Sequence, residues 1–577
     1  MDTSQGPDYE SEKRKSVSTL SSSPRGKNAV LPHDHDDKVE RNTEPSTHSP
    51  SVNDEKTETP HEDTEPQKEY ILGTKLLLLM SSVTFICFLT LLDIVIIGTA
   101  IPSITDAFHS VPDVGWYGGA YTLANAALQP MTGKLYTYFR LKWLFLICFA
   151  VFEVGSLICG LATSSKMLII GRAVAGMGSS GLQNGALTLI SAAVPKSRLP
   201  ALQGICMGGA QLGLVIGPVL GGAFTQYVSW RWCFYINLPI GGVAAASLLF
   251  VDVPDQIPKE KFSIVIRNVW GKLDLAGFVL FASASIMVLM ALQFGGVSHP
   301  WDSSVVIGLF CGGGATYIVF FFWEKRMGDV AMIPPSMISR RIIYCACMFM
   351  AFLMAGTFLS SYYLPIFFQT VKGRSPTMSG VDLLPNIMVN IAFGVSTGVA
   401  ISKLGYYLPF GVASSVFLAI AAGLFSTFSV HTPEARQVGF QVLLGAGQGM
   451  GTQIAILAAQ NGVPERQVAL AISCVMFSQT FMGSIMLTSA NTILNNSLKT
   501  KIPQYAPGVD VQFVVNAGAR GFRKVLKGAA LEGVLHAYAD SIDRVFYLSA
   551  GGACACFCVV WGVGWNDIRR KQVTSPA

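Results

Sequence analysis

Three ionisable side chains interrupt long apolar stretches of this sequence. Asp93 lies in LLDIVIIGTAIPSI, Glu153 in FEVGSLICG and Arg172 in LIIGRAVAGMGSSGLQNG. Charges inside membrane spans are costly, and they usually face a cavity or a partner of opposite charge. We therefore expect Arg172 to pair with Asp93 or Glu153. Either carboxylate could carry a proton, and its protonation would free the arginine and bias two conformations; the alternatives are a static ion pair or a helix-packing hydrogen bond.

A second motif is a run of glycines within one apolar segment, GICMGGAQLGLVIGPVLGG, at residues 204 to 222. Each interior glycine costs a helix roughly 1 kcal/mol against alanine, and a proline costs about 3 kcal/mol. In a membrane, small residues offset this cost because they let two helix backbones touch. The segment therefore predicts a close helix-packing seam, and its recurring positions are Gly204, Gly213, Gly217, Pro218, Gly221 and Gly222.

The composition and the lengths of the apolar segments point to an all-α integral membrane protein. The 577 residues are 51% hydrophobic and 13% charged, whereas soluble domains have roughly 25% charged residues. About fourteen spans are each near the 20 residues that cross about 30 Å of hydrocarbon. They lie at 74–98, 115–134, 143–163, 168–190, 201–224, 233–252, 274–294, 304–323, 342–366, 379–401, 407–428, 437–460, 467–490 and 544–565.

Lysine and arginine gather in alternate gaps between these spans. Arg140 and Lys142 follow the second span, and Lys259 and Arg267 follow the sixth. The positive-inside rule then places both termini in the cytoplasm. The stretch 511–535, between the last two spans, is expected to lie on the outer leaflet as an amphipathic helix.

Other chemistries find no support in the sequence. The twelve cysteines form no Cys-x-x-Cys pair with a histidine cluster, so we expect no metal site. There is no G-x-x-x-x-G-K-[ST] loop, so uphill transport would have to draw on an ion gradient. No nucleophile, base and orienting group occur together, so we expect no enzymatic activity. We also expect no cofactor and no nucleic-acid partner.

These motifs resemble those of the major facilitator superfamily, in particular its fourteen-span drug/proton antiporters. The glycine run matches the antiporter motif of the fifth helix. The stretch around Asp93 is similar to the first-helix motif, and Arg172 matches the arginine of the fourth-helix motif, which is linked to proton transfer in the family. The resemblance therefore implies proton coupling through Asp93, Glu153 and Arg172.

Two further stretches extend the resemblance. GKLYTYFRLKW is similar to the cytoplasmic gating motif, with Gly133, Arg140 and Lys142 in place and Thr137 where the family usually has aspartate. WRWCFYINLPIG resembles a signature at the start of the sixth helix. Fungal toxin and multidrug efflux pumps are the most similar in these forms.

The resemblance implies two six-helix bundles plus two extra helices, with a substrate site between the bundles near the midplane. The expected organisation is a disordered cytoplasmic tail at 1–69, a first bundle at 70–252, a linker with the two extra helices at 253–341, a second bundle at 342–565 with an outer loop at 496–541, and a cytoplasmic tail at 566–577.

Amide and aromatic side chains on the spans are candidates for lining that site. An apolar cavity with a few amides suits uncharged or weakly acidic aromatic molecules, although about half of such amides are expected only to hold helices together. Asn495, with Ser497 two residues on, is a candidate glycan acceptor. The cavity candidates are Gln183, Asn184, Gln211, Tyr362, Asn386, Gln448 and Gln479.

The sequence therefore predicts a monomeric, proton-coupled exporter of small amphipathic molecules, such as a fungal secondary metabolite or a xenobiotic, in the plasma membrane. One alternative is a vacuolar transporter of basic amino acids or siderophores with the same fold. Another is a non-transporting membrane sensor on a transporter scaffold, with the acidic tail as its signalling arm.

Overall fold

The computed structural model describes residues 70–109, 113–255, 259, 262–296, 299–516 and 518–569. The predicted N-terminal tail, 1–69, and the end of the predicted C-terminal tail lie outside these residues. Within them the chain is helical, and β-structure is limited to isolated bridges that pair Gly295 with His299 and Tyr406 with Asp567. The predicted all-α class is confirmed.

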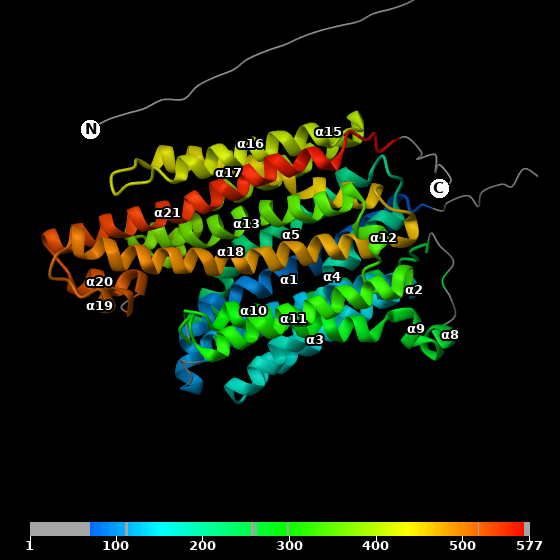
Figure 1. The fold of residues 1–577 in the computed structure, drawn as a ribbon, viewed down its shortest axis with the longest axis horizontal. Coiled ribbons are helices and arrows are strands. Elements are labelled where there is room, and N and C mark those ends of the chain that lie inside the picture. The colour runs from blue at the N-terminus through cyan, green and yellow to red at the C-terminus, as the bar shows by residue number, and fades with distance from the viewer. Residues whose placement is uncertain are drawn as a thin grey trace, which may run out of the picture. The chain divides into compact units, whose positions relative to one another are not determined.

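The first group contains the helices of the N-terminal half of the chain, coloured from blue to blue-green in Figure 1. Helix α3 packs on α4, α1 on α5, and α2 on α4. The bounds are α1 (Gly73–Phe108), α2 (Val114–Tyr138), α3 (Leu141–Gly160), α4 (Ser165–Ala193), α5 (Leu199–Tyr227), α6 (Trp232–Tyr235) and α7 (Asn237–Leu249).

The predicted span 233–252 is divided into α6 and α7 at Ile236. Pro239 explains the break, because proline lacks the backbone N–H and its ring clashes with the carbonyl group four residues earlier, here that of Tyr235.

The second group contains the C-terminal half of the chain, in which α13 packs on α18 and α21, and α15 and α16 pack on α17. Its elements are α13 (Arg341–Thr370), α14 (Pro376–Val381), α15 (Leu384–Leu404), α16 (Leu408–Phe425), α17 (Glu434–Asn461), η3 (Glu465–Gln467), α18 (Val468–Tyr505), α19 (Val511–Asn516), α20 (Gly518–Val525), α21 (Gly528–Val560) and η4 (Trp561–Val563).

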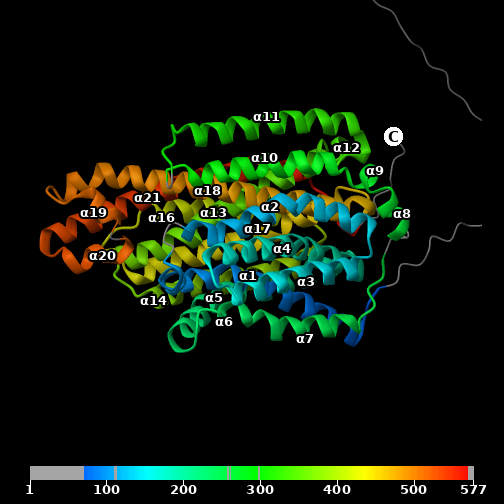
Figure 2. The same ribbon diagram turned by 90° about the horizontal axis from the view of Figure 1, so that it is seen from below.

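Two extra helices, α10 and α11, lie between the groups in sequence. Helix α11 packs on α10, and α10 packs on both α2 and α18 (Figure 2). The elements of this segment are α8 (Phe262–Arg267), α9 (Val269–Leu273), α10 (Leu275–Phe294), α11 (Ser304–Met327), η2 (Gly328–Val330) and α12 (Pro335–Ile338).

Asp274 holds the α10–α11 pair together at one end. It caps α10 in a left-handed conformation, with φ 48°, and accepts a hydrogen bond from the Gly277 N–H at 3.0 Å. The same carboxylate accepts from Trp323 Nε1 at 2.8 Å and from the Met332 N–H at 2.9 Å. One side chain thus joins the start of α10 to the end of α11 and to the segment after it.

Lys134 connects this segment to the end of α2. Its side chain is buried, and its Nζ donates to the carbonyl oxygens of Val330 and Ala331, the latter at 2.7 Å. The α10–α11 pair is therefore attached to the first helical group at this end.

Among the described residues, twelve helices are long and apolar enough to cross a membrane. Helices α2, with 25 residues, and α4, with 29 residues, are long enough but less apolar. Most of α4 is buried inside the protein, which explains how it tolerates polar residues. With these two helices, the described chain has a counterpart for each of the fourteen predicted spans.

The segment expected to be an outer loop at 496–541 is mostly helical. Helix α18 continues to Tyr505, and α21 already begins at Gly528. The expected single amphipathic helix at 511–535 is wrong, because α19, α20 and the first turns of α21 occupy this stretch. Gly528, with φ +60°, starts α21 in a left-handed conformation that interrupts a continuous helix.

Candidate functional site

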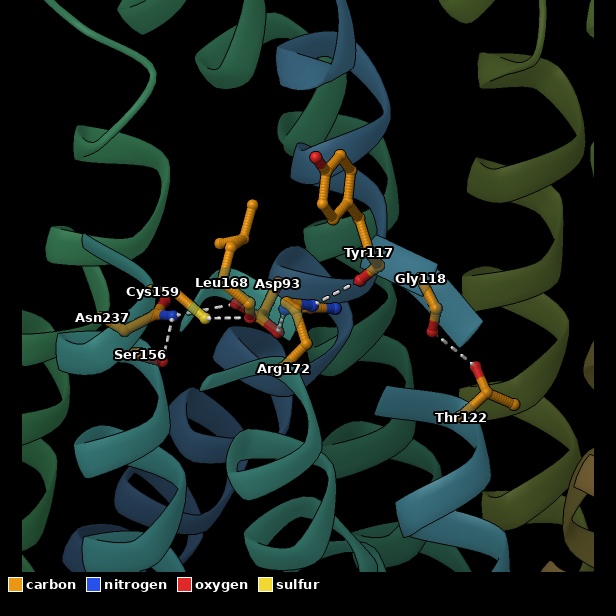
Figure 3. A network of polar contacts seen from close by, with 9 residues as sticks. All are labelled: Asp93, Tyr117, Gly118, Thr122, Ser156, Cys159, Leu168, Arg172 and Asn237. Carbon is orange, nitrogen blue, oxygen red and sulfur yellow. Dashed lines mark hydrogen bonds and ion pairs between the residues drawn. The ribbon is translucent and has the colours of Figure 1, made fainter. Parts of the chain in front are cut away.

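A buried ion pair joins α1 and α4. Arg172 Nη1 donates to Asp93 Oδ2 at 2.5 Å, and the two side chains are 1% and 0% exposed (Figure 3). The arginine predicted to pair with Asp93 or Glu153 therefore pairs with Asp93. Neither charge could be left alone at this depth without a large desolvation cost, so the pair acts as a unit.

Helix α2 and the start of the α6–α7 segment complete the surroundings of Arg172. Its Nε donates to the Tyr117 carbonyl oxygen at 2.8 Å. The guanidinium carbon lies 4.5 Å from the ring centroid of Tyr121 and 5.9 Å from that of Phe234. These contacts fix the guanidinium in one orientation while Asp93 is ionised.

The second oxygen of Asp93 is bound by an uncharged pair. Asn237 Nδ2, at the first residue of α7, donates to Asp93 Oδ1 at 3.3 Å and to Ser156 Oγ of α3 at 3.1 Å (Figure 3). Neither Asn237 nor Ser156 was singled out as a site residue from the sequence. Their only signal was the amide within WRWCFYINLPIG and the hydroxyl three residues after Glu153.

Glu153 is separate from this ion pair. Both of its carboxylate oxygens are buried, and no group in the described part of the chain hydrogen-bonds to either of them. A Cβ atom added to Gly241 of α7 would lie 2.2 Å from Glu153 Oε1. The carboxyl group therefore contacts the backbone of α7 at Gly241, where there is no side chain.

Three motif glycines form the predicted seam between α5 and α1. A Cβ atom at Gly213 would lie 2.6 Å from the Phe88 carbonyl oxygen, and one at Gly221 would lie 2.8 Å from the Ile96 carbonyl oxygen; at Gly217 the Val95 Cβ would be 3.4 Å away. The seam contacts α1 on both sides of Asp93, at Phe88 before it and at Val95 and Ile96 after it. It therefore fixes the helix that carries the carboxylate.

Gly204 and Gly222 do not contact α1. Gly204 approaches α15, because an added Cβ would lie 2.9 Å from the Gly394 carbonyl oxygen. An added Cβ at Gly222 meets nothing within 4 Å, so its expected part in the seam is wrong. Pro218 lies half-buried within α5. The four-residue spacing of Gly213, Gly217 and Gly221 puts them on one face, and Gly222 falls off it.

Comparisons with known proteins identify the family. A family model described as Major Facilitator Superfamily matches residues 83–487. The chain belongs to the major facilitator superfamily. It is 52% identical to the MFS-type transporter pigP of Monascus ruber over 88% of this chain and 89% of the relative, and 50% identical to the efflux pump mlcE of Penicillium citrinum over 89% and 94%. The efflux pump aflT of Aspergillus parasiticus is 38% identical over 87% and 98%.

Membership of the superfamily makes this chain a multi-pass membrane transporter, with a small molecule as substrate, and not an enzyme. In this transporter the two helical groups touch at the predicted cytoplasmic end. A Cβ atom at Gly133 of α2 would lie 2.2 Å from Ser473 Oγ of α18, and one at Gly398 of α15 would lie 2.4 Å from the Pro200 carbonyl oxygen of α5. Gly133 therefore stands at a contact between the groups, as a gate residue should.

The two basic gate candidates lie elsewhere. Arg140 is exposed at the start of α3. Lys142 Nζ donates to the Leu249 carbonyl oxygen at 2.8 Å and lies 3.6 Å from Asp252 Oδ1. These contacts tie α3 to the end of α7 inside one group, so Lys142 does not bridge the groups in this conformation.

We expect Lys142→Met to keep transport within about two-fold of wild type, because ion pairs with an exposed partner contribute less than about 1 kcal/mol. Gly133→Ala should reduce transport at least several-fold, because the added methyl group would meet Ser473 and prevent closure. Export rates in cells expressing equal amounts of each variant measure both effects. Loss of transport in Lys142→Met with normal transport in Gly133→Ala would contradict this assignment.

Three amide side chains, those of Gln211, Asn390 and Gln453, line a small pocket between the helical groups. Gln211 of α5 and Asn390 of α15 exchange hydrogen bonds at 3.4 Å, and Asn390 Nδ2 reaches Gln448 Oε1 of α17 at 3.4 Å. Glycines of α5, α15 and α17 line the same pocket with Gln211, Asn390 and Gln453. These long hydrogen bonds leave polar capacity for a ligand. Gln448 contacts Asn390 but is not part of the pocket lining, so its cavity role stays a prediction.

The other cavity candidates are not brought to this pocket. Asn184 is buried and donates to the Gln129 carbonyl oxygen at 3.1 Å and to Thr132 Oγ1 at 2.8 Å, so it holds α4 to α2; its cavity role stays a prediction. Asn386 is buried where α15 meets α17. For the others a cavity role stays a prediction: Gln183 and Gln479 are half-buried on α4 and α18, and Tyr362 of α13 is 56% exposed.

Two remaining expectations concern glycans and metals. Asn495 lies inside α18, its amide donates to Asn491 Oδ1 at 3.3 Å, and Ser497 is buried. Glycosylation stays a prediction that this helical setting does not favour. Among the described residues, no group of three or more His, Cys, Asp or Glu side chains could hold a metal ion.

Proposed function

We propose that this transporter exports small amphipathic organic molecules, of the fungal secondary metabolite or xenobiotic kind, across the plasma membrane in exchange for protons. The observation that carries the proposal is the fully buried Asp93–Arg172 pair. Protonation of Asp93 would remove the charge that holds Arg172, and the released arginine would favour a different packing of α1 against α4. Relatives named efflux pumps support the direction of transport.

We infer the cargo class only from the chemistry of the side chains at the pocket between the helical groups, because in this conformation the pocket, at about 10 Å³, has room for about one water molecule. Its lining combines glycine backbone, Met207 and a few amides, and no charged side chain of the described residues lines it. Such a surface favours uncharged, partly aromatic molecules with a few hydrogen-bonding groups. A transporter of basic amino acids would need carboxylates there.

Export from cells tests the proposal. Cells that express the full chain are loaded with a panel of fluorescent dyes and fungal metabolites, and release is followed with and without a protonophore. We expect export of at least one compound, its loss with the protonophore, and the chain at the cell surface. Location in the vacuolar membrane would favour the vacuolar alternative, and no export of any compound would contradict the proposal.

Gln211→Leu should raise the KM of an exported compound about 3-fold to 10-fold with little change in maximal rate. One hydrogen bond contributes about 0.5–1.5 kcal/mol, and each 1.4 kcal/mol is about tenfold in affinity. Gln226→Leu is the matched control, because Gln226 lies on the same helix and is exposed. Equal KM values for wild type and Gln211→Leu across all exported compounds would place the substrate elsewhere.

A further inference from the structure

The placement of Glu153 is not explained by the Asp93–Arg172 pair. Its oxygens are buried with no hydrogen-bond donor in the described chain. An ionised carboxylate without a donor or a positive partner is costly inside a protein, and the protonated form avoids this cost. The conformation described here therefore fits a neutral Glu153 beside an ionised Asp93.

Glu153 and Asp93 are connected through the contact between α3 and α7. Ser156, which receives a hydrogen bond from Asn237, follows Glu153 by three residues on α3, and Gly241, which Glu153 touches, follows Asn237 by four residues on α7. Residues three or four apart lie on one helix face. The Glu153–Gly241 contact is thus one turn, about 5 Å along the helix, from the level at which Asn237 binds Asp93.

The Glu153–Gly241 contact lies on the predicted cytoplasmic side of the level at which Asn237 binds Asp93. Helix α3 begins at Leu141, just after the basic loop that follows α2, and α7 ends at Leu249 near Lys142. Glu153 precedes Ser156, and Gly241 follows Asn237. Glu153 is therefore closer to the cytoplasmic ends of both helices than the Asn237–Ser156 level.

Few other charges can act on Glu153 from the surrounding helices. Helices α6 and α7 contain no Asp, Glu, Lys or Arg. Arg172 and Asp93 pair with each other. Lys166 lies at the start of α4, and Asp106 lies at the end of α1. Lys75 lies at the start of α1. Lys134 of α2 is occupied by two carbonyl groups, and Lys142 of α3 by Leu249.

We propose that Glu153 is a second proton-binding site, one helical turn to the cytoplasmic side of Asp93, which holds the transported proton while Asp93 is paired with Arg172. The inference rests on the proposed proton coupling. The proton leaves the Asp93 carboxyl group, whose O–H bond breaks, and forms an O–H bond on ionised Glu153. The Asp93 carboxylate then pairs again with Arg172. Glu153 later loses the proton to the cytoplasm.

Infrared difference spectra of the purified full chain test where the proton is held, without any need for transport. We expect the spectrum of wild type minus Glu153→Gln at neutral pH to contain the carbonyl band of a protonated carboxyl group. Glu324 of α11 is another buried glutamate, whose Oε2 accepts a hydrogen bond from the Ile333 N–H at 2.8 Å. Asp93→Asn and Glu324→Gln should each leave the band of Glu153 in place. A difference that shows only carboxylate bands would overturn the inference. Glu153→Met replaces the glutamine variant if that variant is not recovered folded.

Transport in vesicles supplies a second measurement. With a compound that wild type accumulates in response to an imposed pH gradient, Glu153→Gln should lose at least tenfold of the pH-driven accumulation and keep exchange of labelled for unlabelled compound. Glu153→Asp should restore part of the pH response. Equal pH-driven accumulation by wild type and Glu153→Gln would overturn the inference alone, whereas a wild type with no pH response would overturn the proposed proton coupling.

Discussion

Asp93→Asn should abolish the proposed pH-driven export and lower the free energy of unfolding by about 3–5 kcal/mol, the cost of leaving one member of a buried ion pair without its partner. Arg172 would keep its charge with only the Tyr117 carbonyl oxygen and the Tyr121 ring to compensate it. Thermal unfolding of the purified protein measures the loss of stability, and export under an imposed pH gradient measures the loss of coupling.

The double variant Asp93→Asn with Arg172→Met separates these two effects. Replacement of both members of a buried polar pair is much less costly than removal of one. We expect the double variant to unfold closer to wild type than Asp93→Asn does, yet to remain without pH-driven export. Normal pH-driven export in either variant would show that the ion pair is static and only stabilises the fold.

Gly213→Ala should reduce export at least tenfold, whereas Gly222→Ala should leave it unchanged. The two substitutions add the same methyl group to the same helix. At Gly213 it would meet the Phe88 carbonyl oxygen at 2.6 Å and Leu92 N at 2.8 Å, and at Gly222 it meets nothing within 4 Å. Backbone atoms cannot move aside as a flexible side chain can, so α1 and Asp93 must shift, at about 1–3 kcal/mol or more.

Export rates and unfolding temperatures of the two alanine variants check this prediction. Alanine at Gly222 should stabilise the helix by up to about 1 kcal/mol. Equal loss of export in both variants would mean that the motif acts through its whole length and not through the three glycines that contact α1.

Much of the fold and the central ion pair could be predicted from the sequence, because both follow from the cost of placing polar groups in lipid. Apolar segments of the right length had to be helices, and Arg172 had to find a carboxylate. The ends of the last two long helices could not be predicted this way. Hydropathy reports contact with lipid, and α18 and α21 continue as helices beyond their apolar stretches.

The neutral members of the site were harder to find. Asn237 and Ser156 carry no charge, so their role depends on which helices meet, and that is a property of tertiary packing. The same reason explains why the sequence does not reveal the partner of Lys142, which is the end of α7. Gly222 was grouped with its neighbours by pattern, although it points away from the seam.

The most direct test of the central claim is transport by the purified full chain in lipid vesicles, with a compound from the export panel and an imposed pH gradient as the sole energy source. Proton exchange predicts accumulation against the compound's own gradient, collapse of that accumulation with a protonophore, and no accumulation by Asp93→Asn. Accumulation that is the same with and without the pH gradient, or the same in wild type and Asp93→Asn, would contradict it.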